Sequence, residues 1–294
     1  SDYSFDEGKY EIKFSSSSNS GTTWTDPVVI SSSDENTNSY APAIVADGND
    51  VYVAWQSVSS SGIFTYNIMS RISEDNGDTW GDFSTVTNDD GTNYIPEVAY
   101  DNDRFHVTWH AYAKDGSSDS DYTVEYAYTE DLGVSWERVT LRDGEGSGDF
   151  CWFPDIAIYE NNIYIVWQDD GDYDGDATYD FDVVAIYSED AGDTWNDPVL
   201  IVDSDSQFSN GYTLPAVVSK DNLVYVSYQE YDGSQYEHRF LLSQDYGETW
   251  SDTFPINEGH TVNYAKMDMA IDEKTYFAYY DDADLFSEDN IDYD

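Results

Sequence analysis

Residues 73–80 read SEDNGDTW, and variants of this octapeptide recur along the whole chain. The other copies are SSNSGTTW (17–24), TEDLGVSW (129–136), SEDAGDTW (188–195) and SQDYGETW (243–250). All five share the pattern Ser/Thr-x-Asp/Asn-x-Gly-x-x-Trp, and successive copies start 55 to 59 residues apart. Self-similarity at a nearly fixed period is the sequence signature of a repeat architecture. The chain is therefore expected to be built from repeated copies of one supersecondary unit.

Each fixed position of the octapeptide has a reason in turn geometry. An Asp or Asn side chain accepts hydrogen bonds from nearby backbone N–H groups, Gly permits a positive φ, and Trp supplies a large buried anchor. These residues resemble the Asp-box, or BNR repeat, of the sialidase-like β-propellers, and the resemblance covers essentially the whole chain. The Asp-box position is occupied by Asn19, Asp75, Asp131, Asp190 and Asp245. Asn19 is the one departure, and we expect it to weaken only the first turn.

Four extended segments make up the repeat around the octapeptide. An apolar strand opened by proline (residues 42–45 in one copy) precedes a second apolar strand (51–55), and a third runs into the octapeptide (67–72). A fourth follows it, as in residues 198–202. Proline fits the first residue of a strand, and continuous apolar segments indicate burial on both faces. Four-stranded antiparallel sheets repeated in this way predict an all-β fold, a β-propeller.

The two ends of the chain predict the number of blades. The N-terminal segment holds only strands three and four of a repeat, and the C-terminal segment only strands one and two. We therefore expect five blades, with the last one closed by pairing of the N- and C-terminal strands. Six blades are the alternative, because the Asp-box enzymes of this kind are mostly six-bladed. Residues 1–280 are assigned to a single propeller, and residues 281–294, with seven acids, to an acidic tail or linker.

The charge of the chain excludes several partners. Its 294 residues include 61 Asp+Glu and 11 Lys+Arg, for a formal net charge of −50. Nucleic acids and anionic membrane surfaces bind Lys/Arg patches, so neither is expected as a partner, and no apolar run is long enough to insert into a membrane. Salt screens the repulsion between carboxylates, which predicts a secreted or cell-surface protein in a high-salt environment. An ordinary acidic secreted protein is the alternative.

A ligand site is expected at the face opposite the Asp-boxes, as the resemblance implies. An aromatic residue precedes the first strand of every repeat, and a polar residue follows the aromatic of the second strand. The ligand-binding residues predicted on this face are Tyr40, Tyr94, His110, Trp152, Gln168, Tyr212 and Tyr264. Aromatic rings stack on sugars, which favours a glycan, but the same rings can pack between blades. Gln168 and its equivalents can likewise complete backbone hydrogen bonding at a strand end.

Three carboxylates on the first strands are the catalytic candidates. Glu97, Asp155 and Asp268 occupy the same position of three repeats, where they could serve as acid, nucleophile or base, and pKa-tuning neighbour of a glycosidase. Sialidase activity is not expected. The sialidase resemblance implies an arginine triad, and the positions of the five arginines do not match it.

The run DGDYDGD at residues 170–176 is the metal candidate. Alternating Asp with an interposed Gly resembles the start of an EF-hand loop, so Asp170, Asp172, Asp174 and Asp176 are predicted Ca²⁺ ligands. The twelfth position is Phe181 rather than the usual Glu, and a solvated acidic loop is the alternative. Ca²⁺ is the only cofactor that the sequence suggests.

These features together predict an extracellular Asp-box propeller with a non-catalytic role, the recognition of a glycan or a cell-surface protein. A glycoside hydrolase that uses the three carboxylates and a purely structural spacer are the alternatives.

Overall fold

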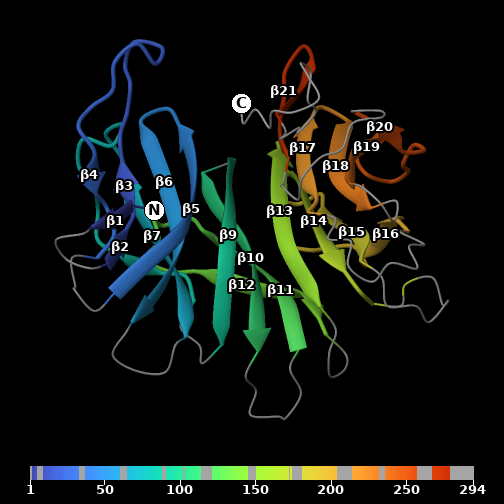
Figure 1. Ribbon diagram of the computed structural model, residues 1–294, viewed down its shortest axis with the longest axis horizontal. Coiled ribbons are helices and arrows are strands. Elements are labelled where there is room, and N and C mark those ends of the chain that lie inside the picture. Colours follow the sequence, from blue (N-terminus) through green and yellow to red (C-terminus); the bar gives the residue numbers. More distant parts are fainter. Residues whose placement is uncertain are drawn as a thin grey trace, which may run out of the picture. The chain divides into compact units, whose positions relative to one another are not determined.

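The computed structural model describes residues 2–4, 9–32, 37–59, 65–87, 91–101, 103–113, 121–144, 150–171, 173, 181–203, 214–231, 236–256 and 267–278. These residues form β-strands, turns and loops, and they include no helix that could cross a membrane. The chain divides into two compact units, Ser1–Asp143 and Gly144–Asp294. Figure 1 colours the first unit from blue to green and the second from lime to red.

The first unit contains two four-stranded antiparallel sheets in which the strands pair in chain order. One consists of β5 (Thr37–Asp47), β6 (Asp50–Ser59), β7 (Tyr66–Ser73) and β8 (Ser84–Thr85). The other consists of β9 (Thr92–Asp101), β10 (Arg104–Ala113), β11 (Asp121–Thr129) and β12 (Glu137–Asp143). Two short pairs precede them, β1 (Asp2–Ser4) with β2 (Lys9–Glu11) and β3 (Lys13–Phe14) with β4 (Val28–Val29).

The second unit repeats this arrangement. Its first sheet consists of β13 (Cys151–Tyr159), β14 (Asn162–Asp169), β15 (Asp182–Ser188) and β16 (Val199–Val202). Its second sheet consists of β17 (Ala216–Lys220), β18 (Leu223–Tyr231), β19 (Tyr236–Ser243) and β20 (Phe254–Pro255). A hairpin of β21 (Asp268–Ile271) and β22 (Thr275–Ala278) follows. The predicted all-β fold with four-stranded antiparallel sheets is therefore confirmed.

The predicted number of blades depends on how the strands at the two ends of the chain pair. At the N-terminus β1 pairs with β2, with Tyr3 opposite Tyr10, which the sequence did not predict. The expected closure would join strands of the two separate units, so five blades, and the single propeller of residues 1–280, stay predictions. The expected acidic tail, residues 281–294, lies outside the described residues.

The first strands begin earlier than expected. In β5, β9 and β13 the proline lies inside the strand, as Pro42 does in β5, whereas we expected it at the first residue. The ladder is interrupted there, with a register shift between Tyr40 and Ala43 in β5. Because β5 is an edge strand of its sheet, a missing N–H at Pro42 is tolerated.

The cores of the units lie between neighbouring sheets. One cluster in the first unit packs Tyr52 and Ile68 of the β5–β8 sheet against Phe105 and Trp109 of the β9–β12 sheet. In the second unit Val166 and Leu241 belong to a cluster that joins the β13–β16 and β17–β20 sheets. The aromatic residues of the second strands, Trp55, Trp109, Trp167 and Tyr228, are at most 2% exposed. In a propeller each blade is a four-stranded sheet, and neighbouring blades pack face to face over such anchors.

The Asp-boxes close the turns after the third strands, as predicted. In the second copy the Asp75 carboxylate accepts from the backbone N–H of Thr79 (2.7 Å) and from its hydroxyl (2.5 Å). The Ser73 hydroxyl donates to Asp75 (2.8 Å) and accepts from the Gly77 N–H (2.8 Å). The same bonds recur around Asp131, Asp190 and Asp245.

Asn19 builds the first turn with one bond reversed. Its Oδ1 accepts from the Thr23 N–H (2.9 Å), while its Nδ2 donates to the Thr23 hydroxyl (2.8 Å). In the other copies that hydroxyl is the donor. An amide can therefore replace the carboxylate because its second atom supplies a donor where the Asp supplies an acceptor.

Candidate functional site

The register of the strands separates two ends of each sheet. In the first sheet Val51 lies opposite Ser73, where the Asp-box begins, while Tyr40 lies opposite Gln56, five residues further along β6. In the second sheet Phe105 lies opposite Thr129 of the Asp-box, while Tyr94 lies opposite His110. The Asp-box turns and the predicted ligand-binding aromatics therefore lie at opposite ends of the same strands.

At the end away from the Asp-boxes, the first unit carries a continuous series of rings that we call the aromatic row. Its members are Tyr10 on β2, Tyr40 on β5, Tyr66 on β7, Tyr94 on β9, His110 on β10 and Tyr122 on β11. The centroids of successive rings lie 5.0 to 6.4 Å apart. A seventh ring, Tyr112, packs against Tyr122 at 5.2 Å. The rings of different strands and sheets thus form one contiguous surface of the unit.

The tyrosines of the row are accessible to solvent. Tyr10 is 39% exposed, and Tyr40, Tyr66, Tyr94 and Tyr122 are all partly exposed. Burial and the neighbouring tyrosines raise the pKa of Tyr40 and Tyr94, so their hydroxyl groups keep their protons and can donate hydrogen bonds. The row therefore combines apolar ring surface with hydroxyl donors.

His110 supports the row from beneath. It is 5% exposed and stacks on Tyr94, with the ring centroids 5.4 Å apart and an interplanar angle of 21°. Burial lowers the pKa of His110 to about 3, so its ring is neutral near pH 7. His110 is thus placed to orient Tyr94 rather than to face solvent.

The sequence identified Tyr40, Tyr94 and His110 but missed Tyr10, Tyr66 and Tyr122. Tyr66 and Tyr122 stand at or next to the start of the third strands, at a similar place in two repeats. Tyr10, Tyr66 and Tyr122 each lie seven residues before the first residue of an Asp-box, so an alignment anchored on the Asp-boxes would have brought the three rings together.

A left-handed residue follows each described aromatic of the first strands. Ala41 (φ 47°), Ile95 (φ 47°) and Phe153 (φ 55°) come directly after Tyr40, Tyr94 and Trp152 and directly before proline. Leu214 (φ 40°) has the same place in the fourth repeat. Such backbone is costly for residues other than Gly, and most of all for β-branched Ile95. Its recurrence beside the predicted ligand face marks this end of the strands as the candidate site.

Glutamines of the second strands stabilise these strained segments. The Gln56 Oε1 on β6 accepts from the Ile95 N–H on β9 at 3.0 Å. The Gln168 Oε1 on β14 accepts from the Leu214 N–H at 3.4 Å, and Gln168 is fully buried. Each glutamine therefore joins one sheet to the next, as the backbone-bonding alternative expected.

The carboxylate candidates are not gathered by either unit into one cluster. Glu97 is half-buried on β9 in the first unit, whereas Asp155 on β13 and Asp268 on β21 belong to the second. The Asp155 Oδ2 accepts from the Val217 N–H on β17 at 2.7 Å, a contact between sheets. Asp268 is exposed, and its Oδ1 accepts from the N–H of Met269 (2.9 Å). Asp155 and Asp268 thus each accept a hydrogen bond from a backbone N–H.

In the second unit Trp152 lies in a cluster of rings of its own. Its ring stacks on Phe181 (5.7 Å, 27°) and contacts Phe150 (4.7 Å) and Phe153 (6.3 Å). The remaining predicted ligand-binding residues, Tyr212 and Tyr264, lie outside the described residues.

The predicted Ca²⁺ loop is described at one of its four acidic residues. The Asp170 Oδ1 accepts from the Phe150 N–H (2.5 Å), and the Asp170 N–H donates to the Phe150 carbonyl (3.1 Å). Asp172, Asp174 and Asp176 lie outside the described residues. Among the residues that are described, no three His, Cys, Asp or Glu side chains cluster closely enough to hold a metal ion. The calcium site stays a prediction.

The neighbouring Asp169 has a structural role that the sequence did not reveal. It is fully buried, accepts from the Trp167 Nε1 (2.7 Å) and the Tyr173 hydroxyl (3.0 Å), and caps the Gly171 N–H (2.9 Å). The first carboxylate of this acidic stretch therefore anchors the buried Trp167.

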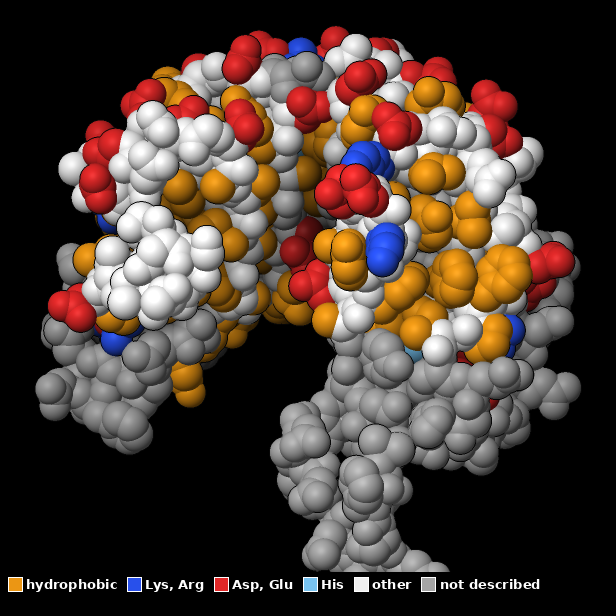
Figure 2. All heavy atoms as spheres, turned by 90° about the horizontal axis from the view of Figure 1, so that it is seen from above, with side chains coloured by type: hydrophobic (Ala, Val, Ile, Leu, Met, Phe, Trp, Pro, Cys, Tyr) orange, Lys and Arg blue, Asp and Glu red, His pale blue; other side chains and the backbone are white. Residues whose placement is uncertain are grey.

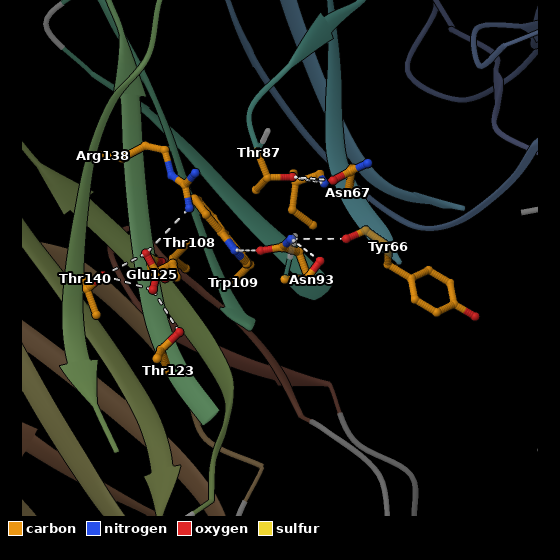
Figure 3. Close-up of polar contacts among 12 residues, drawn as sticks. Tyr66, Asn67, Thr87, Asn93, Thr108, Trp109, Thr123, Glu125, Arg138 and Thr140 are labelled. Atoms are coloured by element: carbon orange, nitrogen blue, oxygen red, sulfur yellow. Dashed lines mark hydrogen bonds and ion pairs between the residues drawn. The ribbon is translucent and has the colours of Figure 1, made fainter. Parts of the chain in front are cut away.

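Next to the aromatic row, a partly buried polar network joins the two sheets of the first unit (Figure 3). The Trp109 Nε1 donates to the Asn93 Oδ1 (2.7 Å), and the Asn93 Nδ2 donates to the Tyr66 carbonyl (3.1 Å). Glu125 accepts from Thr123 (2.8 Å) and Thr140 (3.0 Å) and lies 3.8 Å from Arg138. The network holds the start of β7, and with it Tyr66, beside β9.

The arginines are all engaged in contacts of this structural kind. Arg71 donates to the carbonyls of Gly81 (2.7 Å) and Ile30 (3.2 Å), and Arg104 pairs with Glu130 (2.6 Å). Arg138 contacts Glu125 and the Trp109 ring, Arg142 donates to the Asp143 carbonyl, and Arg239 pairs with Glu230 (3.1 Å). Figure 2 shows how sparse cationic side chains are beside Asp and Glu on the face it presents. Each of these arginine contacts is thus with a backbone carbonyl, a carboxylate or an aromatic ring of the protein itself.

An all-β fold of four-stranded antiparallel sheets, with Asp-box turns at one end and aromatic residues at the other, defines a sialidase-like β-propeller. The sequence pattern of the BNR repeat-like domain family matches residues 4–207, so the chain belongs to this family. A search of curated protein sequences finds no match.

Solved structures that resemble the chain are propeller enzymes with low sequence identity. The Hadza microbial sialidase Hz136 shares 14% identity at a TM-score of 0.63, over 92% of this chain and 57% of the sialidase. The α-L-arabinofuranosidase arb93a of Fusarium graminearum shares 18% identity at a TM-score of 0.62, over 89% of this chain and 77% of the enzyme. The α-L-arabinanase of Penicillium chrysogenum, complexed with arabinobiose, shares 19% identity at a TM-score of 0.54, over 82% and 72%. The chain thus spans little more than half of the sialidase, and these likenesses support the fold.

Proposed function

We propose that the protein is a recognition module for neutral glycans and that the aromatic row of the first unit is its binding surface. The observation that carries this proposal is the row itself, in which exposed or partly exposed tyrosines from five strands, with His110 between Tyr94 and Tyr122, form a continuous series of ring contacts. Tyrosine rings present apolar faces to the C–H groups of a sugar and hydroxyl groups to its oxygens. The glycoside hydrolases among the structural neighbours support a glycan as the ligand class.

Charge favours a neutral sugar over a sialylated one. The five arginines are bound to backbone carbonyls or carboxylates, as described above, and a net charge of −50 repels an anionic ligand. A sialic acid carboxylate would need a cationic clamp to offset its desolvation.

The described contacts favour recognition over catalysis. A glycosidase needs two carboxyl groups facing one pocket, about 5 to 10 Å apart. Asp155 is instead bound to the Val217 N–H, and Asp268 to the N–H of the next residue. A glycoside hydrolase is the second candidate because of the enzymes among the neighbours, and a structural spacer is the third.

We further propose a secreted or cell-surface location in a salty environment. The support is the excess of carboxylates, whose mutual repulsion weakens as the Debye length falls to about 3 Å in 1 M salt.

A glycan array in molar salt, combined with hydrolysis assays on arabinan and sialosides, tests the function. We expect binding to neutral oligosaccharides and no turnover. Turnover that is lost in Asp155→Asn, a substitution that keeps an acceptor for Val217, would instead establish the hydrolase. Neither binding nor turnover would leave the structural spacer.

A further inference from the structure

A second candidate binding surface lies at the other end of the first unit. A groove of about 790 Å³ runs between the Asp-box turn after β7 and the turn after β11. We call it the box groove, and its side chains include Glu74, Trp80, Asp82, Phe83, Leu132 and Val134. It shares no residue with the aromatic row, and its volume is within the range of small-ligand and peptide side-chain pockets.

The third Asp-box differs from its four siblings where it forms this groove. In TEDLGVSW the two variable tip positions hold Leu132 and Val134. Thr22, Asp78, Asp193 and Glu248 stand where Val134 does. Val134 is 86% exposed and Leu132 47%. Since all four sibling turns fold with a polar residue at the position of Val134, and the first two also with a polar residue at the position of Leu132, the turn does not need these apolar side chains.

The apolar tip faces a further exposed ring across the groove. Phe83, which follows the second Asp-box, is 46% exposed. Contiguous apolar side chains on a protein surface mark interaction sites, whereas scattered single ones do not. In a chain with 61 acidic residues such a patch is unusual.

The rings of the groove suit side chains better than a flat sugar. Trp80 packs edge-on against Phe14 (5.0 Å, 73°), and Trp136 against Phe105 (5.7 Å, 66°). The Arg71 guanidinium lies over the Phe83 ring at 4.6 Å from its centroid. Ring surface used in this way offers less of the open face that sugar stacking requires.

The charge of the groove indicates which charge its partner carries. Glu74, Asp75 and Asp82 line it, and the Arg71 guanidinium over Phe83 offsets only part of their charge, so the groove is negative. Asp75 is engaged in its turn, while Glu74 and Asp82 are exposed. A second copy of this acidic chain would be repelled, whereas a basic segment would be attracted.

We propose that the box groove binds a segment of a partner protein in which large apolar residues are flanked by Lys or Arg. The apolar side chains insert between Phe83 and the Leu132–Val134 tip, and the flanking cations meet Glu74 and Asp82. High salt screens the ion pairs but leaves apolar burial intact, so contact with the tip dominates the affinity there.

The test uses a fluorescein-labelled probe peptide, Gly-Lys-Lys-Leu-Phe-Lys-Lys-Gly, in 2 M NaCl, with fluorescence anisotropy as the readout. The double variant Leu132→Asn, Val134→Asp places at these two positions the residues of the second Asp-box. Since the second Asp-box folds as the same turn, the variant should fold. The matched control is Ala191→Asn, which makes the corresponding change in the fourth Asp-box. Equal melting temperatures would establish that the variants are folded.

We expect the double variant to bind the probe at least tenfold more weakly than the wild type, and the control to bind unchanged. A peptide with Ser-Ser in place of Leu-Phe should bind the wild type as weakly as the full probe binds the double variant. Equal binding of the probe to wild type and double variant would overturn the proposal. So would equal binding, in 0.15 M NaCl where the ion pairs are less screened, of a peptide with Glu in place of Lys. Wild-type dimers that the double variant abolishes, or loss of array glycans from the double variant, would also overturn it.

Discussion

At the scale of single residues, the Asp-box glycine carries two requirements at once. Gly77 has φ 87°, and a Cβ added there would overlap the Phe14 ring of the preceding strand pair. Gly21 has φ 79° but no atom within 4 Å of such a Cβ. The two positions therefore separate the conformational requirement from the packing requirement.

We expect Gly77→Ala to destabilise the protein by about 2–4 kcal/mol, since both left-handed strain and overpacking apply. Gly21→Ala should cost only about 1–2 kcal/mol, from strain alone. Urea denaturation measures both. Equal losses would show that the contact with Phe14 contributes nothing.

The Asp-box carboxylates also make the stability of the fold depend on pH in the acidic range. The hydroxyl and backbone N–H of Ser135 are the main donors that lower the pKa of Asp131 to about 2, from an ordinary value of 3.8. The pKa values of Asp75, Asp190 and Asp245 are lowered for the same reason. A carboxyl with a lowered folded-state pKa stabilises the fold above its unfolded pKa, and this stability is lost as pH falls through the folded pKa.

The free energy of unfolding should therefore fall as pH decreases from about 4 to about 2. Asp131→Asn should make the free energy of unfolding less dependent on pH, because Asn does not titrate and unfolding then takes up as much as about one proton fewer. Asn19 shows that an amide can form the turn. Denaturant midpoints measured every half unit of pH test this. An unchanged slope would mean that Asp131 does not gain its stabilising bonds on folding.

At the scale of elements, the left-handed residues before proline shape the candidate site. Their backbone bends the first strands and places the preceding aromatic at the strand end, and Gln56 holds the bend after Tyr94 by accepting from the Ile95 N–H. These first strands could be predicted from apolar periodicity, but their bulges could not. Ala41, Ile95 and Phe153 are not residues that favour positive φ, so tertiary contacts impose that conformation.

Gln56→Met should destabilise the protein by about 1–3 kcal/mol, because it leaves the Ile95 N–H without its acceptor. Gln56→Glu keeps an acceptor and is the matched control. Hydrogen exchange at the Ile95 amide should accelerate in the Met variant alone. Similar exchange rates in both variants would rule out the bond between the sheets as the source of protection.

Part of the candidate site could be predicted because its residues stand at fixed places in the repeat. Tyr40 and Tyr94 stand at a fixed place before proline, so the repeat alignment revealed them. Tyr66 and Tyr122 stand seven residues before their Asp-boxes, so the same alignment could have revealed them. The contact by which Asn93 and Trp109 hold the start of β7 against the next sheet is encoded by no local pattern. Asp155 shares its position with Glu97 and Asp268 and accepts from the backbone of the neighbouring sheet, a contact that the alignment did not show, and the catalytic role of the three acids stays a prediction.

At the scale of the whole molecule, the net charge of −50 opposes folding through self-repulsion. Few of these carboxylates are paired, since 11 Lys+Arg face 61 Asp+Glu. We expect the melting temperature to rise by about 5–10 °C between 0.1 M and 2 M NaCl, a few kcal/mol for a chain of this size. Differential scanning calorimetry measures it, and a melting temperature that does not respond to salt would remove the argument for a high-salt environment.

The central claim is that the aromatic row binds neutral glycans. The most direct test is isothermal titration, in 1 M NaCl, of neutral oligosaccharides, arabinobiose among them, and of a sialylated oligosaccharide. The proteins to compare are the wild type, Tyr40→Ala, Tyr94→Ala, and the control Tyr276→Ala, which removes a 57% exposed ring of the second unit. We predict that a neutral sugar binds the wild type and the control equally, that each row variant loses about tenfold in affinity, and that the sialylated sugar does not bind. Binding that survives both row substitutions, or a preference for the sialylated sugar, would contradict the claim.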